Sequence, residues 1–501
     1  MELVFQEHKL EYWNRTICQS VTQEQTAELI VPDRQPDAER VVDACGTVLI
    51  RTEECAANAV SVAGSVSVGV LFVDSDGRIH RLQGQVPFSL RREVNSEEPE
   101  RVLQARCTLC TVDARLLNSR KVLVRVSVRC ELRVYSRSSA SIFDLAEPSP
   151  SLQLRRKELP LRLPLAMGEK SFTLNEELVL PAGKPPIAEL LKWVCRMQVL
   201  EQKPVGARQV FKGELTVHAL YEDPDGGLQS FESSLPFSQF ADLGQECPDG
   251  EARTLLSLTS MEVEPDGQLE CRRLLLSVGL LAQCMVMGEQ RVTMIDDAYC
   301  TDAELTPKYA DWSVCATLDR PGFRETAVAT CDTPAQSVVD AWLYSDEPQR
   351  RREGERVVLE LPFHCNVLYR DAEGILQGQT LHSALTLETA LAEQGDCCVE
   401  QLTGGELYTS SGPNGIELRC PMSVELECFA EETLHAVCGG EILQDEGKTE
   451  RRPAVVLRRT DGPEEIWQIA KATRSTVDSI MAANELLNET VPAETLLLIP
   501  M

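Results

Sequence analysis

The segment LFVDSDGRI, residues 71–79, decides the fold, because two close copies of it recur along the chain. The copies are LYEDPDGGL at 220–228 and LYRDAEGIL at 368–376, so their glycines, Gly77, Gly226 and Gly374, are separated by 149 and 148 residues. A fixed interval of this kind indicates internal repeats of one structural module. In each copy an acidic turn that ends in glycine separates two apolar runs. This pattern predicts a β-hairpin, since aspartate tolerates tight turns and glycine adopts positive φ.

Other landmarks keep the same interval. Each copy opens with an apolar pair and closes with a Ser-Val dipeptide; the pairs are Val41-Val42, Leu190-Leu191 and Val338-Val339, and the dipeptides stand at 127–128, 277–278 and 423–424. With about 150 residues as a typical domain length, we predict three tandem modules, at 1–150, 151–298 and 299–445, and a separate tail at 454–501. Linkers are expected at 147–151 and 299–309, and a boundary at 447–453.

Each module is predicted to be mainly β. Residues 60–73, 213–221 and 359–369 alternate small or polar side chains with branched apolar ones, which is typical of half-buried strands. The segments PDAERVVDA at 36–44 and PPIAELLKW at 185–193 are predicted to form one short helix near the start of each of their modules.

Charge and composition exclude several classes of partner. The 501 residues carry a net charge of -29, which opposes binding to nucleic acid and to anionic lipid. The basic segment 154–162, LRRKELPLR, is either a solvated linker or a local contact patch. The N-terminal segment lacks the apolar core of a signal peptide and no window of about 20 apolar residues exists, so we expect a chain made in the cytosol without membrane insertion. The 19 cysteines suit reduced thiols better than a disulfide framework.

The tail breaks the repeat pattern. Its order of segments, VVLRR, EEIWQIAKAT, STVDSIMAAN and TLLLIP, predicts a strand, two helices and a closing strand. Apolar residues follow helical spacing at Ile466, Ile469 and Ala470 in the first helix and at Val477, Ile480 and Met481 in the second. Ser475 followed by Asp478 predicts the N-cap of the second helix.

The tail resembles a LysM domain in GPEEIWQIA at 462–470, TVDSIMAAN at 476–484 and LLLIP at 496–500. The resemblance implies a groove for a glycan or a protein partner, formed by Gly462, Pro463, Glu464, Glu465, Ile466 and Asn484. The chain departs from the family where Gly-Asp-Thr has become Gly-Pro-Glu-Glu and where the final Pro-Gly has become Pro492-Ala493. These departures count against binding of N-acetylglucosamine.

The three modules resemble SPOCS domains, which occur in spore coat proteins of endospore-forming bacteria. The resemblance rests on LIVPDRQPDAERVVDACGTVLI at 29–50, on the glycine turns and on the Ser-Val strands. SPOCS-like modules followed by one LysM-like domain are similar to a coat-assembly adaptor of clostridia. This order implies a non-enzymatic scaffold in the mother-cell cytoplasm, at the forespore surface and in the coat, that binds the coat morphogenetic ATPase SpoIVA and other coat proteins. The alternative is a cell-wall protein that binds peptidoglycan.

The first tail helix carries Trp467, Lys471 and Arg474 at i, i+4 and i+7. One interpretation is a partner-binding stripe of an aromatic anchor and two cations. The other is that Trp467 completes the small core of the tail while the two cations are solvated. Since Ile466 and Ile469 define the buried face, Trp467 is expected at its edge.

The sequence predicts no catalytic residue, cofactor or metal ion. Cys107 and Cys110 have CxxC spacing but no second ligand pair, and Cys397-Cys398 is poorly placed for joint ligation, so ordinary thiols are expected. The six histidines occupy non-equivalent positions in the repeats, and no HExxH, GxSxG or Walker sequence occurs. The acidic turns lack the further oxygen ligands of a calcium loop and are explained by hairpin geometry.

Overall fold

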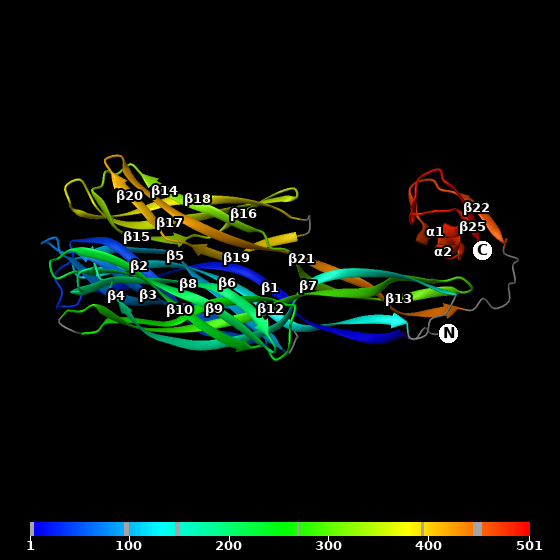
Figure 1. Ribbon diagram of the computed structural model, residues 1–501, viewed down its shortest axis with the longest axis horizontal. Coiled ribbons are helices and arrows are strands. Elements are labelled where there is room, and N and C mark those ends of the chain that lie inside the picture. Colours follow the sequence, from blue (N-terminus) through cyan, green and yellow to red (C-terminus); the bar gives the residue numbers. More distant parts are fainter. Residues whose placement is uncertain (1–4, 95–99, 146–150, 268–269, 392–394, 444–452) are drawn as a thin grey trace.

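The structure is a computed structural model that describes residues 5–94, 100–145, 151–267, 270–391, 395–443 and 453–501. Figure 1 shows an elongated body of long strands with a small helical domain near one end. The predicted linker at 147–151 and the predicted boundary at 447–453 lie almost entirely outside the described residues. No helix among the described residues is long and apolar enough to cross a membrane.

The first module contains two three-stranded antiparallel sheets. Its strands are β1 (Phe5–Ile30), β2 (Arg40–Ala56), β3 (Ala59–Val73), β4 (Ile79–Glu93), β5 (Arg101–Asn118) and β6 (Lys121–Leu145). One sheet has the order β1-β6-β5 and the other the order β2-β3-β4. Valines on β3 and β6 dominate the core between the sheets, because alternate side chains of each strand face inward.

The second module repeats this arrangement. Its strands are β7 (Leu152–Val179), β8 (Glu189–Val205), β9 (Arg208–Glu222), β10 (Leu228–Asp242), β11 (Glu251–Pro265) and β12 (Arg273–Cys300). The sheet orders β7-β12-β11 and β8-β9-β10 are those of the first module with each strand number raised by six.

The third module has the same plan with interrupted strands. Its elements are β13 (Glu304–Asp319), β14 (Gly322–Cys331), β15 (Ser337–Ser345), β16 (Gln349–Glu353), β17 (Arg356–Arg370), β18 (Leu376–Ala390), β19 (Gly395–Gly404), β20 (Tyr408–Gly412) and β21 (Gly415–Leu443). β13 and β14 both pair with β21, as do β19 and β20, so each pair takes the place of one long strand in the other modules. The prediction of three tandem β-rich modules is confirmed.

The acidic turns have nearly identical geometry. In each turn the glycine has positive φ, at 78° for Gly77 and 82° for both Gly226 and Gly374. The first aspartate of each turn, Asp74, Asp223 or Asp371, accepts hydrogen bonds from the backbone N–H groups two and four residues later. The carboxylates therefore satisfy the turn backbone, which is the hairpin role predicted for them.

The predicted short helices are wrong, because 40–44 lies in strand β2 and 189–193 lies in strand β8. The apolar pairs mark β-bulges instead. The strand register shifts between Val41 and Asp43, between Leu190 and Lys192, and again at the equivalent place in β15. A bulge inserts one extra residue and re-aims its neighbours, so adjacent apolar residues imitate helical spacing in the sequence.

The residue after each bulge lies where the three modules meet. Asp43, Lys192 and Asp340 are separated by the repeat intervals, and the Lys192 Nζ lies 2.7 Å from an Asp43 carboxylate oxygen and 2.8 Å from an Asp340 oxygen. The side chain of Lys192 is only 1% exposed. Since equivalent positions of three copies meet at one point, the modules surround a common pseudo-threefold axis.

Apolar residues at equivalent positions surround this axis. Leu71, Leu220 and Leu368 belong to one buried cluster, which also contains the hairpin residues Ile79 and Leu376. The leucines and hairpin residues come from the quoted LFVDSDGRI segment and its two copies. The repeated hairpin is therefore both a turn and a packing surface between modules.

A second buried ionic junction joins the modules farther along the body. Glu427 on β21 accepts hydrogen bonds from Arg15 of the first module at 2.6 Å and from Arg253 of the second at 2.9 Å. Burial alone would raise the pKa of Glu427, but the two guanidinium groups outweigh burial and hold that pKa well below its usual range. Here one anion satisfies two cations, the reverse of the arrangement at Lys192.

Beyond Glu427 the strand pairs β1–β6, β7–β12 and β13–β21 continue as three two-stranded ribbons, here called the stalk. Their inward side chains form a separate apolar core that includes Tyr12, Leu163, Met294, Val314 and Leu434. The stalk thus has residues from every module and its own packed interior.

The tail has the predicted order of strand, two helices and strand. Its elements are β22 (Val455–Arg459), β23 (Glu464–Glu465), α1 (Ile466–Thr473), α2 (Val477–Ala483), β24 (Thr490–Val491) and β25 (Leu496–Pro500). β22 pairs with β25, and the helices cover one face of this sheet. The N-cap of α2 is Thr476 and not Ser475, because the Thr476 hydroxyl accepts from the Ser479 N–H while the Ser475 hydroxyl donates to the Pro500 carbonyl.

Replacing Lys192 by methionine is expected to lower the free energy of unfolding by about 3–5 kcal/mol, because two buried carboxylates would lose their shared cation. The measurement is urea denaturation followed by circular dichroism. Lys212→Met is the control, since Lys212 and Glu201 form an exposed pair that solvent screens and that contributes little to stability. Equal effects from the two substitutions would contradict this account of the junction.

Candidate functional site

The tail is docked on the end of the stalk through α1. The Trp467 indole Nε1 donates to an Asp297 carboxylate oxygen on β12 at 2.8 Å, and the Lys471 Nζ lies 2.7 Å from the other oxygen. Trp467 is 8% exposed and stands edge-on to Tyr299, with ring centroids 4.9 Å apart. The Tyr299 hydroxyl donates to the Ser475 carbonyl at 2.8 Å. Five groups, three from the tail and two from the stalk, thus converge on one contact.

Asp297 is the polar centre of this contact. Burial alone would raise its pKa, but hydrogen bonds from Lys471 and Trp467 lower the pKa below its usual value. Arg155 on β7 adds an ion pair with Glu465 at 3.3 Å and lies over the Trp467 ring. The basic segment 154–162 therefore contributes to tail docking and is not only a solvated linker.

The predicted partner-binding stripe of Trp467, Lys471 and Arg474 does not act as one surface, because two of its residues take part in tail docking and the third does not. Trp467 and Lys471 both face Asp297 of the second module, whereas Arg474 ends α1 in the left-handed conformation with φ of 57°. Trp467 completes the core of the tail and also joins it to the stalk. The sequence could not show the second role, because Asp297 is 170 residues away from Trp467 along the chain.

The predicted groove residues have mostly structural contacts. Ile466 is fully buried, and the Asn484 side chain exchanges hydrogen bonds with the backbone of Leu498 on β25. Glu464 pairs with Arg458 at 2.8 Å, and Glu465 pairs with Arg155. Gly462 and Pro463 form the turn that leads into this segment. Glu465 thus places one edge of the segment 462–466 against the stalk, whereas Asn484 lies against β25.

The tail sheet exposes an apolar face on the side away from the helices. Leu457 and Leu496 are 66% and 64% exposed, and Val455 and Leu498 are exposed as well. These residues alternate with buried ones because successive side chains of a strand point to opposite faces. We call Val455, Leu457, Leu496 and Leu498 the outer sheet face. Clustered exposed apolar residues of this kind are typical of protein-binding surfaces.

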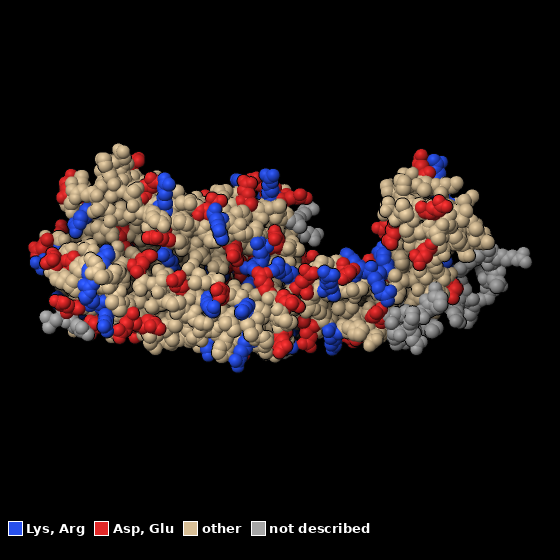
Figure 2. All heavy atoms as spheres, viewed as in Figure 1, with Lys and Arg blue, Asp and Glu red and all other residues tan. Residues whose placement is uncertain are grey.

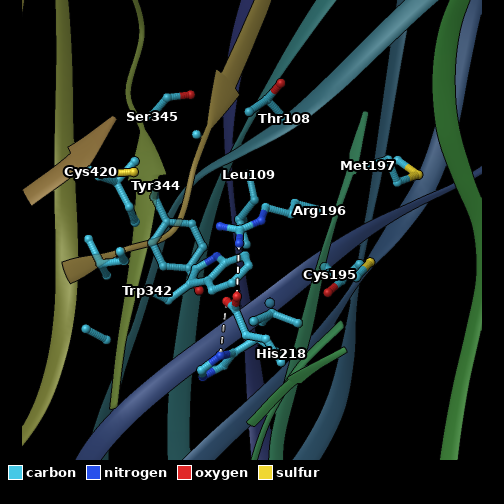
Figure 3. Close-up of a pocket in the computed structure, with 18 of the residues that line it drawn as sticks. Thr108, Leu109, Cys195, Arg196, Met197, His218, Trp342, Tyr344, Ser345 and Cys420 are labelled. Atoms are coloured by element: carbon cyan, nitrogen blue, oxygen red, sulfur yellow. Dashed lines mark hydrogen bonds and ion pairs between the residues drawn. The ribbon is translucent and has the colours of Figure 1, made fainter. Parts of the chain in front are cut away.

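A cavity of about 640 Å³ lies where the three modules meet. Figure 3 shows Leu109 of the first module, Arg196 and His218 of the second and Trp342 of the third around this space. Glu232 joins two of the lining groups, accepting from Arg196 at 3.1 Å and lying 3.4 Å from His218. The charged groups named here are therefore paired within the protein.

His218 connects this cavity to the axial ion pairs. Its Nε2 lies 2.5 Å from Asp340, on the side opposite Glu232. Burial alone would lower the pKa of His218, but the two carboxylates outweigh burial and raise the pKa to about 9. His218 is therefore protonated at neutral pH, and its charge balances the second axial carboxylate.

The thiols near the cavity are poor nucleophiles. Burial raises the pKa of Cys195 to about 12. The Cys107 thiol lies 3.4 Å from Cys130 on the neighbouring strand, whereas the Cys110 thiol faces a backbone carbonyl, so the CxxC pair does not converge on one site. All 19 cysteines are free thiols. The described lining residues thus form no activated nucleophile.

Two groups in the described part of the chain bring three possible metal ligands together. One comprises Cys398, Glu400 and Glu427, whose carboxylates already pair with Arg133, Arg15 and Arg253. The other comprises Asp346, His364 and His382 in the third module.

On the visible face of the molecule, Figure 2 shows lysine and arginine side chains interspersed with aspartate and glutamate rather than gathered into one basic field.

The free energy of unfolding is expected to fall as pH rises from about 6.5 toward 9. Between these pH values His218 keeps its proton in the folded chain, where its pKa is about 9, but has lost it in the unfolded chain. Urea midpoints at pH 6.5 and 8.0 measure the effect. In His218→Asn the fall between these pH values should become smaller, whereas the exposed control His8→Asn should keep it. An unchanged slope in His218→Asn would refute this assignment.

Asp297→Ala is expected to release the tail without unfolding the modules, because it removes the acceptor of both Trp467 and Lys471. Hydrogen exchange should become faster in α1 and at the end of β12, while exchange in β3 and β9 remains slow. Asp311→Ala is the control, since Asp311 pairs with His435 on the stalk surface. Unchanged exchange in α1 would show that Asp297 does not hold the tail.

Residues 37–131 and 186–265 match the family model described as SipL, SPOCS domain. The first match runs from the approach to β2 into β6, and the second runs from the approach to β8 to the end of β11, so they cover equivalent parts of two modules. No curated protein and no solved structure matches the chain. This match implies a protein related to sporulation or the spore coat. The chain therefore contains SPOCS domains of the SipL type at 37–131 and 186–265.

Proposed function

We propose that this protein is an adaptor in spore-coat assembly that binds the coat morphogenetic ATPase SpoIVA through its LysM-like tail. The match of two modules to the SipL SPOCS domain carries the proposal. The adaptor acts in the mother-cell cytoplasm, at the forespore surface, where other coat proteins join it. Its partners are proteins and not nucleic acid, in keeping with the net charge of -29.

The outer sheet face is the proposed contact with SpoIVA. Trp467 and Lys471 are engaged by Asp297 in the docked tail, so a partner reaches them only after the tail leaves the stalk. Leu457, Leu496 and Leu498, in contrast, are exposed while the tail is docked. Apolar side chains grouped on a small rigid sheet supply the buried centre that a protein interface requires.

Glycan binding is the rival activity of the tail. Two of the groove residues, Ile466 and Asn484, are committed to the interior and to the β25 backbone. Two others, Glu464 and Glu465, hold arginine partners. These contacts favour a protein partner at the outer sheet face over a sugar chain in the groove.

The double substitution Leu457→Asp and Leu498→Asp is expected to weaken binding of purified SpoIVA at least tenfold, because charges would be buried at an apolar interface. Surface plasmon resonance measures binding, and a nearly unchanged melting temperature shows that the tail remains folded. Leu487→Asp is the control, since Leu487 is 94% exposed on the same domain but outside the outer sheet face.

Two further variants distinguish the possible outcomes. A chain lacking 454–501 should keep the β-rich circular dichroism of the modules but lose SpoIVA binding and forespore localisation. Lys471→Glu should bind SpoIVA as the parent does if the outer sheet face is the contact. Loss of binding in Lys471→Glu alone would assign the interface to Trp467, Lys471 and Arg474. If the parent chain does not bind SpoIVA but sediments with insoluble peptidoglycan, the tail is a glycan-binding domain.

A further inference from the structure

Three side chains with metal-binding atoms meet on one sheet of the third module. Asp346 follows β15, His364 lies on β17 and His382 lies on β18. One ligand atom from each of these residues lies within 4.8 Å of the corresponding atoms of the other two. The two histidines are direct cross-strand partners, so the β17–β18 hairpin itself brings the imidazoles together.

The distances in this group suit shared ligation better than a strong ion pair. The His364 Nδ1 lies 3.1 and 3.3 Å from the two carboxylate oxygens of Asp346. A tetrahedral zinc site with bonds of about 2.0–2.1 Å places neighbouring ligand atoms about 3.3 Å apart. The contact between His218 and Asp340 is shorter, at 2.5 Å, although His218 also lies 3.4 Å from Glu232. The His80–Asp74 contact, at 2.8 Å, is shorter as well.

The surroundings hold the group in place. His364 is buried and stacks on Tyr344, with ring centroids 5.3 Å apart, while His382 is exposed at the opening of the group. The Asp346 N–H donates to the Pro362 carbonyl, and the Asp346 carbonyl accepts from Arg129 of the first module at 2.6 Å. The group is therefore closed on the side of His364 and Tyr344 and is open to solvent on the side of His382.

Charges near the group do not exclude a cation. Arg129 is the nearby positive group, and its guanidinium pairs with Glu131 at 3.1 Å. Glu347 follows Asp346 in the chain and adds a carboxylate, which accepts a hydrogen bond from Thr22 of the first module. The second group of possible ligands, around Glu427, differs in this respect because three arginines occupy its carboxylates.

We propose that Asp346, His364 and His382 form a binding site for one divalent first-row transition metal ion, of which zinc is the representative. Two imidazoles and one carboxylate suit zinc, cobalt or nickel better than calcium or magnesium, which prefer oxygen ligands alone. The fourth position, on the side of His382, is open to water. The bound ion joins β15, β17 and β18 and so fixes the edge of the third module where Arg129 contacts it.

Cobalt titration of the full-length chain tests the site, because Co²⁺ replaces zinc and absorbs visible light in a low-symmetry site. The parent is expected to bind one tight equivalent with visible bands and without the near-ultraviolet charge-transfer band of thiolate ligands. Competition with Zn²⁺ alone should remove these bands. In His382→Ala the affinity for this equivalent should fall at least tenfold, since a direct ligand is lost.

Two comparisons complete the test. His435→Ala is the matched control, because His435 also pairs with an aspartate, Asp311, and stacks on a tyrosine but belongs to no three-ligand group among the described residues. This control should bind cobalt as the parent does. His382 is exposed, so its removal leaves the fold intact, which the melting temperature without metal verifies. A parent without a tight equivalent, or a His382→Ala variant that binds as tightly as the parent, would overturn the proposal.

Discussion

One shared lysine holds the three modules together. Lys192 lies on the pseudo-threefold axis between Asp43 and Asp340, and none of the three side chains has appreciable contact with water. Burying an ion costs several kcal/mol unless the partners and hydrogen bonds are complete, so the axis tolerates only a matched set. Three identical subunits would place three like charges at this point. A single chain with diverged copies avoids that repulsion, because one copy supplies a lysine where the other two supply aspartates.

The other inter-module contacts depend on the same divergence. At Glu427 one anion from the third module satisfies arginines from the first and the second, so loss of any module leaves a buried charge without its partner. The axis positions Leu71, Leu220 and Leu368 are leucine in all three copies, since identical apolar side chains can pack together without charge repulsion. Equivalent positions therefore kept their identity where they pack and changed it where they carry charge. The modules form one body for this reason, although each has its own core.

The sequence predicted the features that depend on local physics. The repeat interval, the positive φ of Gly77 and its equivalents, and the order of elements in the tail follow from turn chemistry and periodicity. The short helices at 36–44 and 185–193 were wrong because a bulge imitates helical spacing. The contact of Trp467 with Asp297 joins residues far apart in the chain, which no local pattern reveals. A signal for the His364–His382 pair existed, since both lie nine residues from the centre of the third acidic turn, Glu373.

The stalk gives the tail a fixed position relative to the modules. Its three ribbons share one apolar interior, and Asp297 and Tyr299 hold the tail at their end. If the proposed partners bind the tail and the modules, they are kept at a set separation and orientation, in contrast to partners joined by a flexible tether, whose encounter depends on effective concentration. In the proposed adaptor role such a molecule would work as a spacer, and its length would determine how far apart two layers of an assembly are placed.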